Sequence, residues 1–164
     1  MTSDQLSMFE GESIPAPRPS NAKPFNFSVS RTIAAPAEKI FDRWLIPTFI
    51  GNWMFGPKVG NEKVLDLKNE VRPKGEFTYK IQRDGREIIC RGEYKVIDRP
   101  KRLSFSWQEN DLEAGKVNVS FEQHEDKTKL KISVQVPQSL SDQLEKIKQQ
   151  WTARCKALSV QLSK

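Results

Sequence analysis

Hydrophobic and polar residues alternate along most of the chain between Phe25 and Val136, with the period of two that is typical of β-strands. Asp84-Gly85 separates two of these runs, and this dipeptide is a strong signal for a β-hairpin. Because each run has one apolar face and short turns join them, the pattern predicts an antiparallel sheet with a meander topology. The alternating runs cover residues 25–31, 64–67, 77–81, 88–96, 103–107, 117–121 and 130–136.

Helical spacing replaces this alternation in two places. Apolar residues from Ala37 to Leu45 recur on one helical face, with Pro36 at the first helical position, and a second short helix or irregular segment follows. After Pro137, apolar residues from Leu140 to Leu162 recur at spacings of three and four, which predicts one long amphipathic helix of about six turns. We expect its apolar stripe to cover the sheet, with a coiled-coil dimer as the alternative.

The first 24 residues have a different composition from the rest of the chain. They contain four of the ten prolines and a single aromatic residue, and they show neither the strand nor the helix period. Such a segment buries too little apolar surface to offset the entropy of ordering. The sequence therefore predicts a disordered tail over residues 1–24 and one domain over residues 25–164.

Composition excludes several classes of protein. Two cysteines, Cys90 and Cys155, make neither a disulfide framework nor a four-ligand zinc site, and His124 is the single histidine available for a catalytic triad. No apolar run approaches the roughly 20 residues that span a bilayer, and no secretory signal is recognisable, so we expect a cytoplasmic protein. The net charge is +6, but the basic residues are spread out, and we expect neither nucleic-acid binding nor a metal or other cofactor.

The order of elements resembles the helix-grip fold of the START-like (SRPBCC) superfamily, and the motifs resemble its branch homologous to the activator of heat-shock-protein ATPase. Two positions depart from that pattern: Lys74 and Gln150 stand where the family commonly has glycine. The resemblance spans residues 25–162. Its main motifs are Arg31-Thr32-Ile33-Ala34-Ala35-Pro36, Trp53-Met54-Phe55-Gly56-Pro57, Glu70 to Phe77, Gly92-Glu93-Tyr94, Pro100 to Trp107, and Trp151.

This resemblance implies an α+β helix-grip fold in which a curved antiparallel sheet of six to seven strands wraps around the long C-terminal helix. Such an arrangement encloses a space, and inward-facing aromatic and thiol side chains are candidates to bind a ligand there. The alternative is that the same side chains simply fill the core. The candidates are Trp44, Phe49, Trp53, Phe77, Tyr79, Cys90, Tyr94, Phe105, Trp107, Phe121, Trp151 and Cys155.

Three functional interpretations follow from the resemblance and from a motif in the tail. The leading interpretation is non-enzymatic binding of a small hydrophobic molecule between the sheet and the C-terminal helix. The second is a protein-interaction domain, which acts either as a co-chaperone of a heat-shock ATPase or as an accessory factor tethered to the DNA sliding clamp. A cyclase-like enzyme acting on an aromatic substrate is the third, but the sequence shows no recognisable acid–base set.

The sliding-clamp hypothesis comes from the tail. Gln5-Leu6-Ser7-Met8-Phe9 resembles the pentapeptide by which bacterial replication and repair proteins dock on the clamp, with methionine in its fourth place. Leu6, Met8 and Phe9 would enter a hydrophobic groove, and Gln5 would be the polar anchor.

Overall fold

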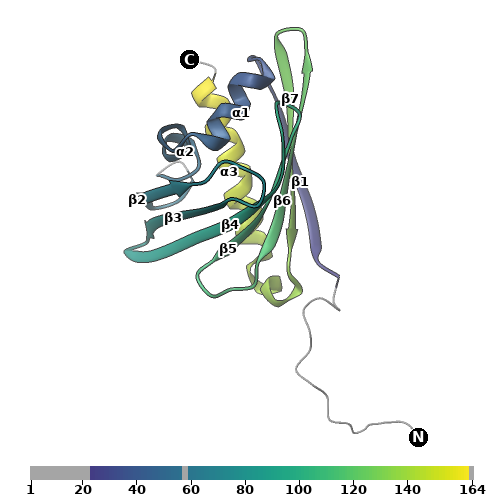
Figure 1. The fold of residues 1–164 in the computed structure, drawn as a ribbon. Helices are drawn as coiled ribbons and strands as arrows, with labels where there is room; N and C mark the ends of the chain where they lie inside the picture. Colours follow the sequence, from purple (N-terminus) through teal and green to yellow (C-terminus); the bar gives the residue numbers. More distant parts are fainter. Residues whose placement is uncertain (1–22, 57–58, 163–164) are drawn as a thin grey trace, which may run out of the picture.

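The computed structural model describes residues 23–56 and 59–162. The element order matches the prediction from the sequence (Figure 1). It runs β1 (Phe25–Ile33), α1 (Ala37–Leu45), α2 (Pro47–Trp53), β2 (Glu62–Asn69), β3 (Glu76–Arg83), β4 (Arg86–Asp98), β5 (Arg102–Glu109), β6 (Gly115–His124), β7 (Lys127–Val136), the 3-10 helix η2 (Gln138–Gln143) and α3 (Leu144–Leu162).

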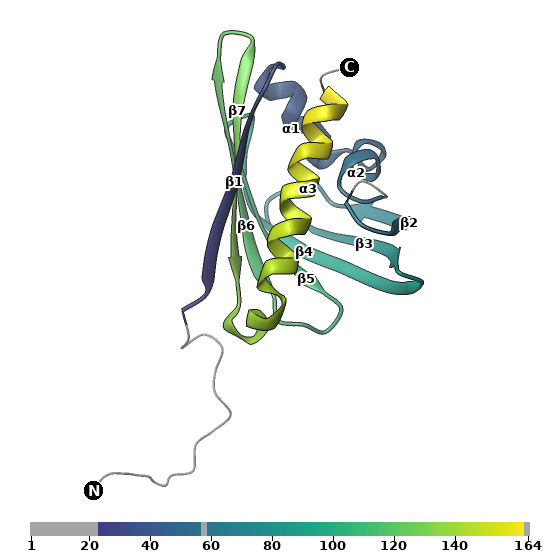
Figure 2. The ribbon, with the colours of Figure 1, turned by 180° about the vertical axis from the view of Figure 1, so that it is seen from behind.

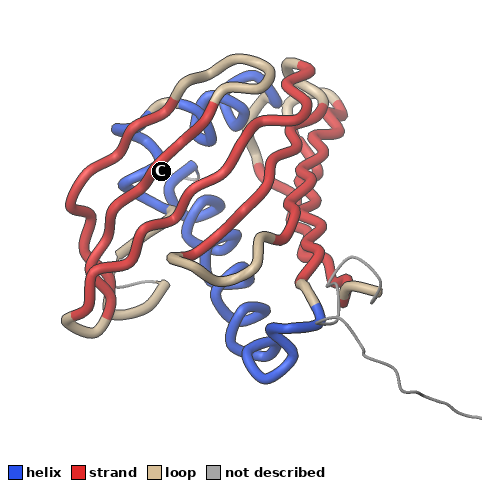
Figure 3. The backbone as a smooth tube through the Cα atoms, turned by 60° about the horizontal axis from the view of Figure 1, so that its bottom comes forward, coloured by secondary structure: helices blue, strands red, loops and turns tan. Residues whose placement is uncertain are grey.

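The seven strands form one curved antiparallel sheet in the order β1-β7-β6-β5-β4-β3-β2. Strands β2 to β7 form the predicted meander, and β1 completes the sheet by pairing with β7. Helix α3 lies across one face of this sheet, with α1 and α2 near its C-terminal end (Figure 2). The strands form one layer, and the helices gather on a single side of it (Figure 3). The helix-grip fold is thereby confirmed.

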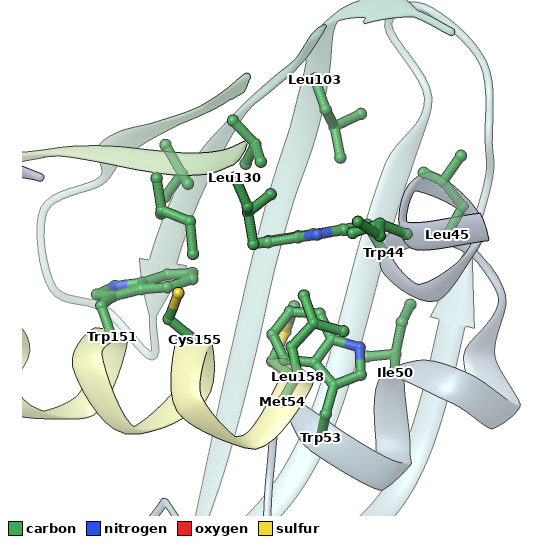
Figure 4. Packing of buried hydrophobic residues seen from close by; sticks show 14 of the residues in the cluster. Trp44, Leu45, Ile50, Trp53, Met54, Leu103, Leu130, Trp151, Cys155 and Leu158 are labelled. Carbon is green, nitrogen blue, oxygen red and sulfur yellow. The ribbon is translucent and has the colours of Figure 1, made fainter. Parts of the chain in front are cut away.

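The apolar stripe of α3 faces the sheet, as predicted. Trp151 is only 1% exposed, and Cys155 and Leu158 are fully buried. Figure 4 shows these three side chains projecting from α3 into the core, which Trp44 and Trp53 enter from α1 and α2. Packing within the chain therefore accounts for the stripe without a coiled-coil partner.

The start of the C-terminal helix differs from the prediction. The α-helix begins at Leu144, and the preceding six residues form η2, in which Leu140 has the non-helical angles φ −105° and ψ 23°. Ser139 donates a hydrogen bond to the carboxylate of Glu113 in the β5–β6 loop. This contact joins η2 to the β5–β6 loop beside the point where the helical conformation is interrupted.

The inward face of β4 also differs from the prediction at its C-terminal end. A register shift between Tyr94 and Val96 changes which side chains face the core. Ile97, and not the predicted Val96, packs against the core opposite Leu103 of β5. A bulge adds one residue to a strand, so the alternation that places Tyr94 inward changes its phase beyond it.

The turn before β3 has a lysine in a backbone state that favours glycine. Lys74 has a φ of 66°, in the left-handed region that glycine adopts most easily. The next residue, Gly75, has no room for a side chain, because a Cβ atom there would lie 2.2 Å from the carbonyl oxygen of Glu70. Backbone hydrogen bonds join this turn to Tyr94, so it packs directly on β4.

Candidate ligand-binding site

A groove opens between α3, η2 and the neighbouring ends of β5, β6 and β7. Trp107 of β5 and Trp151 of α3 line it, and their ring centroids are 5.3 Å apart in an edge-to-face contact. Its volume is about 60 Å³, room for a few water molecules. The apolar part of the lining includes Val134, Val136, Pro137, Leu140 and Ile147, and the polar part includes Arg83, Glu109, Gln143, Lys146 and Gln150.

Deeper between the sheet and α3, aromatic rings fill the interior. Phe77 is central, with its ring centroid 4.7 Å from that of Tyr79, 5.5 Å from that of Tyr94 and 5.6 Å from that of Phe105. The space left among these rings measures about 10 Å³, which is room for about one water molecule. Most of the predicted ligand-binding aromatic side chains thus contact one another.

The remaining aromatic candidates do not line the groove and pack against other side chains. Trp44 and Trp53 contact each other, with centroids 4.7 Å apart, and Phe121 packs against Phe41 of α1. Phe49 is half-buried beneath the guanidinium of Arg43, away from the aromatic interior. Of the predicted ligand-binding residues, Trp107 and Trp151 are the two that line the groove.

The polar groups of the aromatic interior are mostly satisfied by the protein itself. The Tyr94 hydroxyl donates to the Asn69 side-chain oxygen at 2.6 Å, and the Asn69 amide nitrogen donates to the Leu45 carbonyl at 2.7 Å. Burial raises the pKa of Tyr94 to about 12, so its hydroxyl stays neutral. The Trp53 indole donates to the Arg43 carbonyl at 2.8 Å. These groups serve the fold and are not free to hold a ligand.

The two cysteine thiols are also unsuited to act as nucleophiles. Cys90 and Cys155 are free and buried, and burial raises the pKa of Cys90 to about 12 and that of Cys155 to about 11. Both therefore stay protonated and unreactive at neutral pH.

His124 lies on the surface, 3.4 Å from the carboxylate of Glu122. Within residues 23–56 and 59–162, no group of three histidine, cysteine or acidic residues is arranged to hold a metal.

A buried charged cluster, which the sequence analysis did not predict, lies beside the groove. Arg83 of β3 donates from Nε to Glu62 at 2.7 Å and from its two terminal nitrogens to Glu109 at 2.9 and 3.2 Å. The side chains of Arg83, Glu62 and Glu109 are 11%, 1% and 19% exposed. Burial alone would raise the pKa of Glu109, but the hydrogen bonds and charge of Arg83 outweigh it and hold that pKa below its ordinary value.

Arg154 of α3 is a second buried arginine, with no exposed surface. Its Nε donates to the Met54 carbonyl at 3.0 Å, and its guanidinium carbon lies 4.7 Å from the ring centroid of Trp151, 5.2 Å from that of Trp107 and 5.5 Å from that of Phe55. Nη1 and Nη2 have no hydrogen-bond partner among the described residues. Burial lowers the pKa of Arg154, although the nearby carboxylates of Glu109 and Glu62 oppose that shift.

Comparison with known proteins places this geometry in a family. The family model of the Activator of Hsp90 ATPase homolog 1-like protein matches residues 34–162. The chain belongs to this family. The match confirms the resemblance seen in the sequence motifs, and no curated protein matches the chain.

Several solved structures have the same fold as this chain, although their sequence identity to it is low. A protein from Chromobacterium violaceum has a TM-score of 0.73 and is 17% identical, over 86% of this chain and 99% of its own. A protein from Mycobacterium smegmatis has a TM-score of 0.71 and is 17% identical, over 84% and 90%. An HSP90 activator from Plasmodium falciparum has a TM-score of 0.59 and is 21% identical, over 77% and 87%. At these identities the likeness establishes the fold alone.

The second departure from the family pattern lies in the groove itself. Gln150, at a position where the family commonly has glycine, is half-buried and contributes to the groove lining next to Trp151. A side chain at this position occupies space that a glycine would leave open.

Two further expectations concern location and partners. No helix in the described part of the chain is long and apolar enough to cross a membrane. The proposed clamp-docking residues Gln5, Leu6, Met8 and Phe9 lie outside the described residues, so that interpretation stays a prediction from the sequence.

Proposed function

We propose that this protein binds a small hydrophobic molecule in the groove between α3 and the ends of β5 to β7. The observation that supports this most is the pairing of Trp107 and Trp151 along a groove that has both apolar and polar side chains in its lining. Ligand sites typically combine such apolar walls with a few polar groups. Because the groove is small, the molecule would occupy it with one ring or a short chain, and the side chains at the mouth would move apart to admit more.

Changing the size of the side chain at position 150 tests this proposal. We expect Gln150→Trp, which adds an indole to the groove wall, to weaken binding of the neutral fluorescent probe N-phenyl-1-naphthylamine by about tenfold or more. Gln150→Ala removes part of the wall and is expected to strengthen binding. The measurement is a titration followed by probe emission, with native mass spectrometry of the freshly purified protein to detect a molecule that copurifies.

The matched control is Gln149→Trp, which places the same indole on the exposed neighbouring position. It should leave the probe affinity within about twofold of the wild type. Equal affinities for Gln150→Trp, Gln150→Ala and the wild type would contradict a site in this groove. Failure of the wild type to bind the probe at all would argue against the hydrophobic-ligand function.

A second candidate function is interaction with a heat-shock ATPase. Two observations favour it: the family description names an activator of Hsp90 ATPase, and one structure with this fold is an HSP90 activator. We expect addition of the purified protein to change the rate of ATP hydrolysis by an HSP90-class ATPase. An unchanged rate, with the protein in large molar excess, would rule this candidate out.

A further inference from the structure

The guanidinium of Arg154 lies in surroundings that leave most of its hydrogen-bonding capacity unused. An arginine side chain has five N–H donors. In the described part of the chain, only Nε of Arg154 has an acceptor, the carbonyl of Met54, while Nη1 and Nη2 are buried without one. Buried polar groups in proteins are nearly always hydrogen-bonded, so an arginine in this state calls for an acceptor that the protein itself does not supply.

Aromatic rings around Arg154 do not replace that acceptor. Phe55, Trp107 and Trp151 surround the guanidinium at 4.7 to 5.5 Å, and their π faces partly offset its charge. They leave the N–H groups at Nη1 and Nη2 unpaired. Two of these rings, Trp107 and Trp151, also line the groove. A single layer of side chains therefore separates the unpaired donors from the proposed ligand site.

The charged side chains near Arg154 indicate which kind of hydrogen-bond acceptor fits beside it. Arg83 and Arg154 carry two positive charges, and Glu62 and Glu109 carry two negative charges, so this buried group of four is neutral overall. Glu62 and Glu109 both act on Arg154 through their charges. An organic anion would add an excess negative charge next to these carboxylates, whereas a carbonyl oxygen accepts hydrogen bonds and leaves the balance intact.

We propose that Arg154 donates hydrogen bonds to the carbonyl oxygen of a neutral ligand, such as an aryl or alkyl ketone, a quinone or a lactone. The apolar part of that ligand occupies the groove, and its carbonyl reaches Arg154 when the contacting rings of Trp107 and Trp151 move apart. This proposal rests on the proposed function and specifies the chemical class of its ligand. The alternative is that internal water bridges Arg154 to the carboxylates, in which case a ligand carbonyl brings no advantage.

Three small molecules, each with a phenyl ring on a four-carbon chain, separate these possibilities. 4-Phenylbutan-2-one carries a carbonyl, butylbenzene carries no acceptor, and 4-phenylbutyrate carries a negative charge. Each is titrated by calorimetry into the wild type, Arg154→Met and Lys156→Met. The last variant is the matched control, because Lys156 is an exposed cation on the same helix and the same charge is lost.

We expect the affinity ratio of the ketone to butylbenzene to fall about tenfold in Arg154→Met, because hydrogen bonds from a charged donor are the strong ones. The affinity for butylbenzene itself should change little, and Lys156→Met should keep the wild-type ratio. Methionine matches the apolar stem of arginine, so the variant should fold, and its melting temperature verifies this. Should it fail to fold, Arg154→Lys, which keeps the charge but loses the two terminal nitrogens, is expected to lower the ratio to a smaller extent.

Several outcomes would overturn the inference. An unchanged ratio in Arg154→Met, with butylbenzene still bound, leaves the groove as a binding site and refutes the role of Arg154. If 4-phenylbutyrate binds more tightly than the ketone, and if this preference is lost in Arg154→Met, the site takes an anion and not a neutral carbonyl. If neither butylbenzene nor N-phenyl-1-naphthylamine binds the wild type, the proposed function fails, and absence of ketone binding then refutes this inference as well.

Discussion

Arg83→Met is expected to destabilise the folded protein by about 3–5 kcal/mol at neutral pH. Arg83 donates hydrogen bonds to both Glu62 and Glu109 and so holds the two buried carboxylates in place. Methionine removes the positive charge and leaves two negative charges in the interior without their partner. Removing one member of a buried ion pair is among the most destabilising single changes, because the remaining charge stays desolvated. Urea unfolding of both proteins measures the difference.

The pH dependence of stability should change its sign in the same variant. In the wild type the pKa of Glu109 lies below its ordinary value, so its contribution to stability is present at neutral pH and is lost as the pH falls through the folded-state pKa. Without Arg83, only the charge of Arg154 and a hydrogen bond from Trp107 still oppose burial, and we expect burial to outweigh them and raise the pKa of Glu109. The variant should therefore become more stable, relative to the wild type, as the pH falls from 7 toward about 5.

The control is the double variant Arg83→Met, Glu109→Gln, which removes one charge of each sign and leaves Glu62 and Arg154 to balance each other. It should regain much of the lost stability, since the buried group is again neutral overall. Equal stabilities of Arg83→Met and the wild type, or parallel pH profiles, would show that the cluster is hydrated and not part of the dry interior.

Much of the fold could be predicted from local patterns. Alternation places Phe77, Tyr79 and Phe105 on the inner face, and the helical period places Trp151 and Leu158 toward the sheet, because each pattern follows directly from backbone geometry. The β4 bulge and the late start of α3 could not be predicted in this way. A bulge and the boundary of a helix are details of local geometry that the period of hydrophobic residues does not encode.

The chemistry of the site could be predicted only in part. The sequence indicates which aromatic residues face inward, but whether they enclose a cavity depends on how ring shapes fit together, and here Phe77 and its neighbours fill the space. The charged residues also carry a signal in the sequence. Arg83 and Glu109 continue the inward alternation of their strands, and Arg154 follows Trp151 by three residues on the apolar stripe of α3. A charge at an inward position marks a buried polar site more sharply than another aromatic residue does.

Trp151→Ala is expected to lower the free energy of unfolding by about 3–5 kcal/mol and to weaken the binding of N-phenyl-1-naphthylamine. Trp151 is 1% exposed and contacts Trp107 at 5.3 Å and the guanidinium of Arg154 at 4.7 Å. Its removal leaves a cavity between α3 and β5, takes away one wall of the groove, and exposes the charge of Arg154 to that cavity. Denaturant unfolding gives the loss of stability, and probe titration gives the loss of affinity.

Two control variants separate stability from binding. Thr152→Ala, at the exposed neighbouring position, should change the unfolding free energy by less than about 0.5 kcal/mol and leave the affinity unchanged. Trp151→Phe keeps an aromatic wall and should retain more of both properties than alanine does. Affinities have to be compared at a temperature where every variant is folded, because an unstable variant binds less for that reason alone. If Trp151→Ala is destabilised as expected but binds the probe as well as the wild type does, the ligand lies elsewhere and the groove is only a packing defect beside α3.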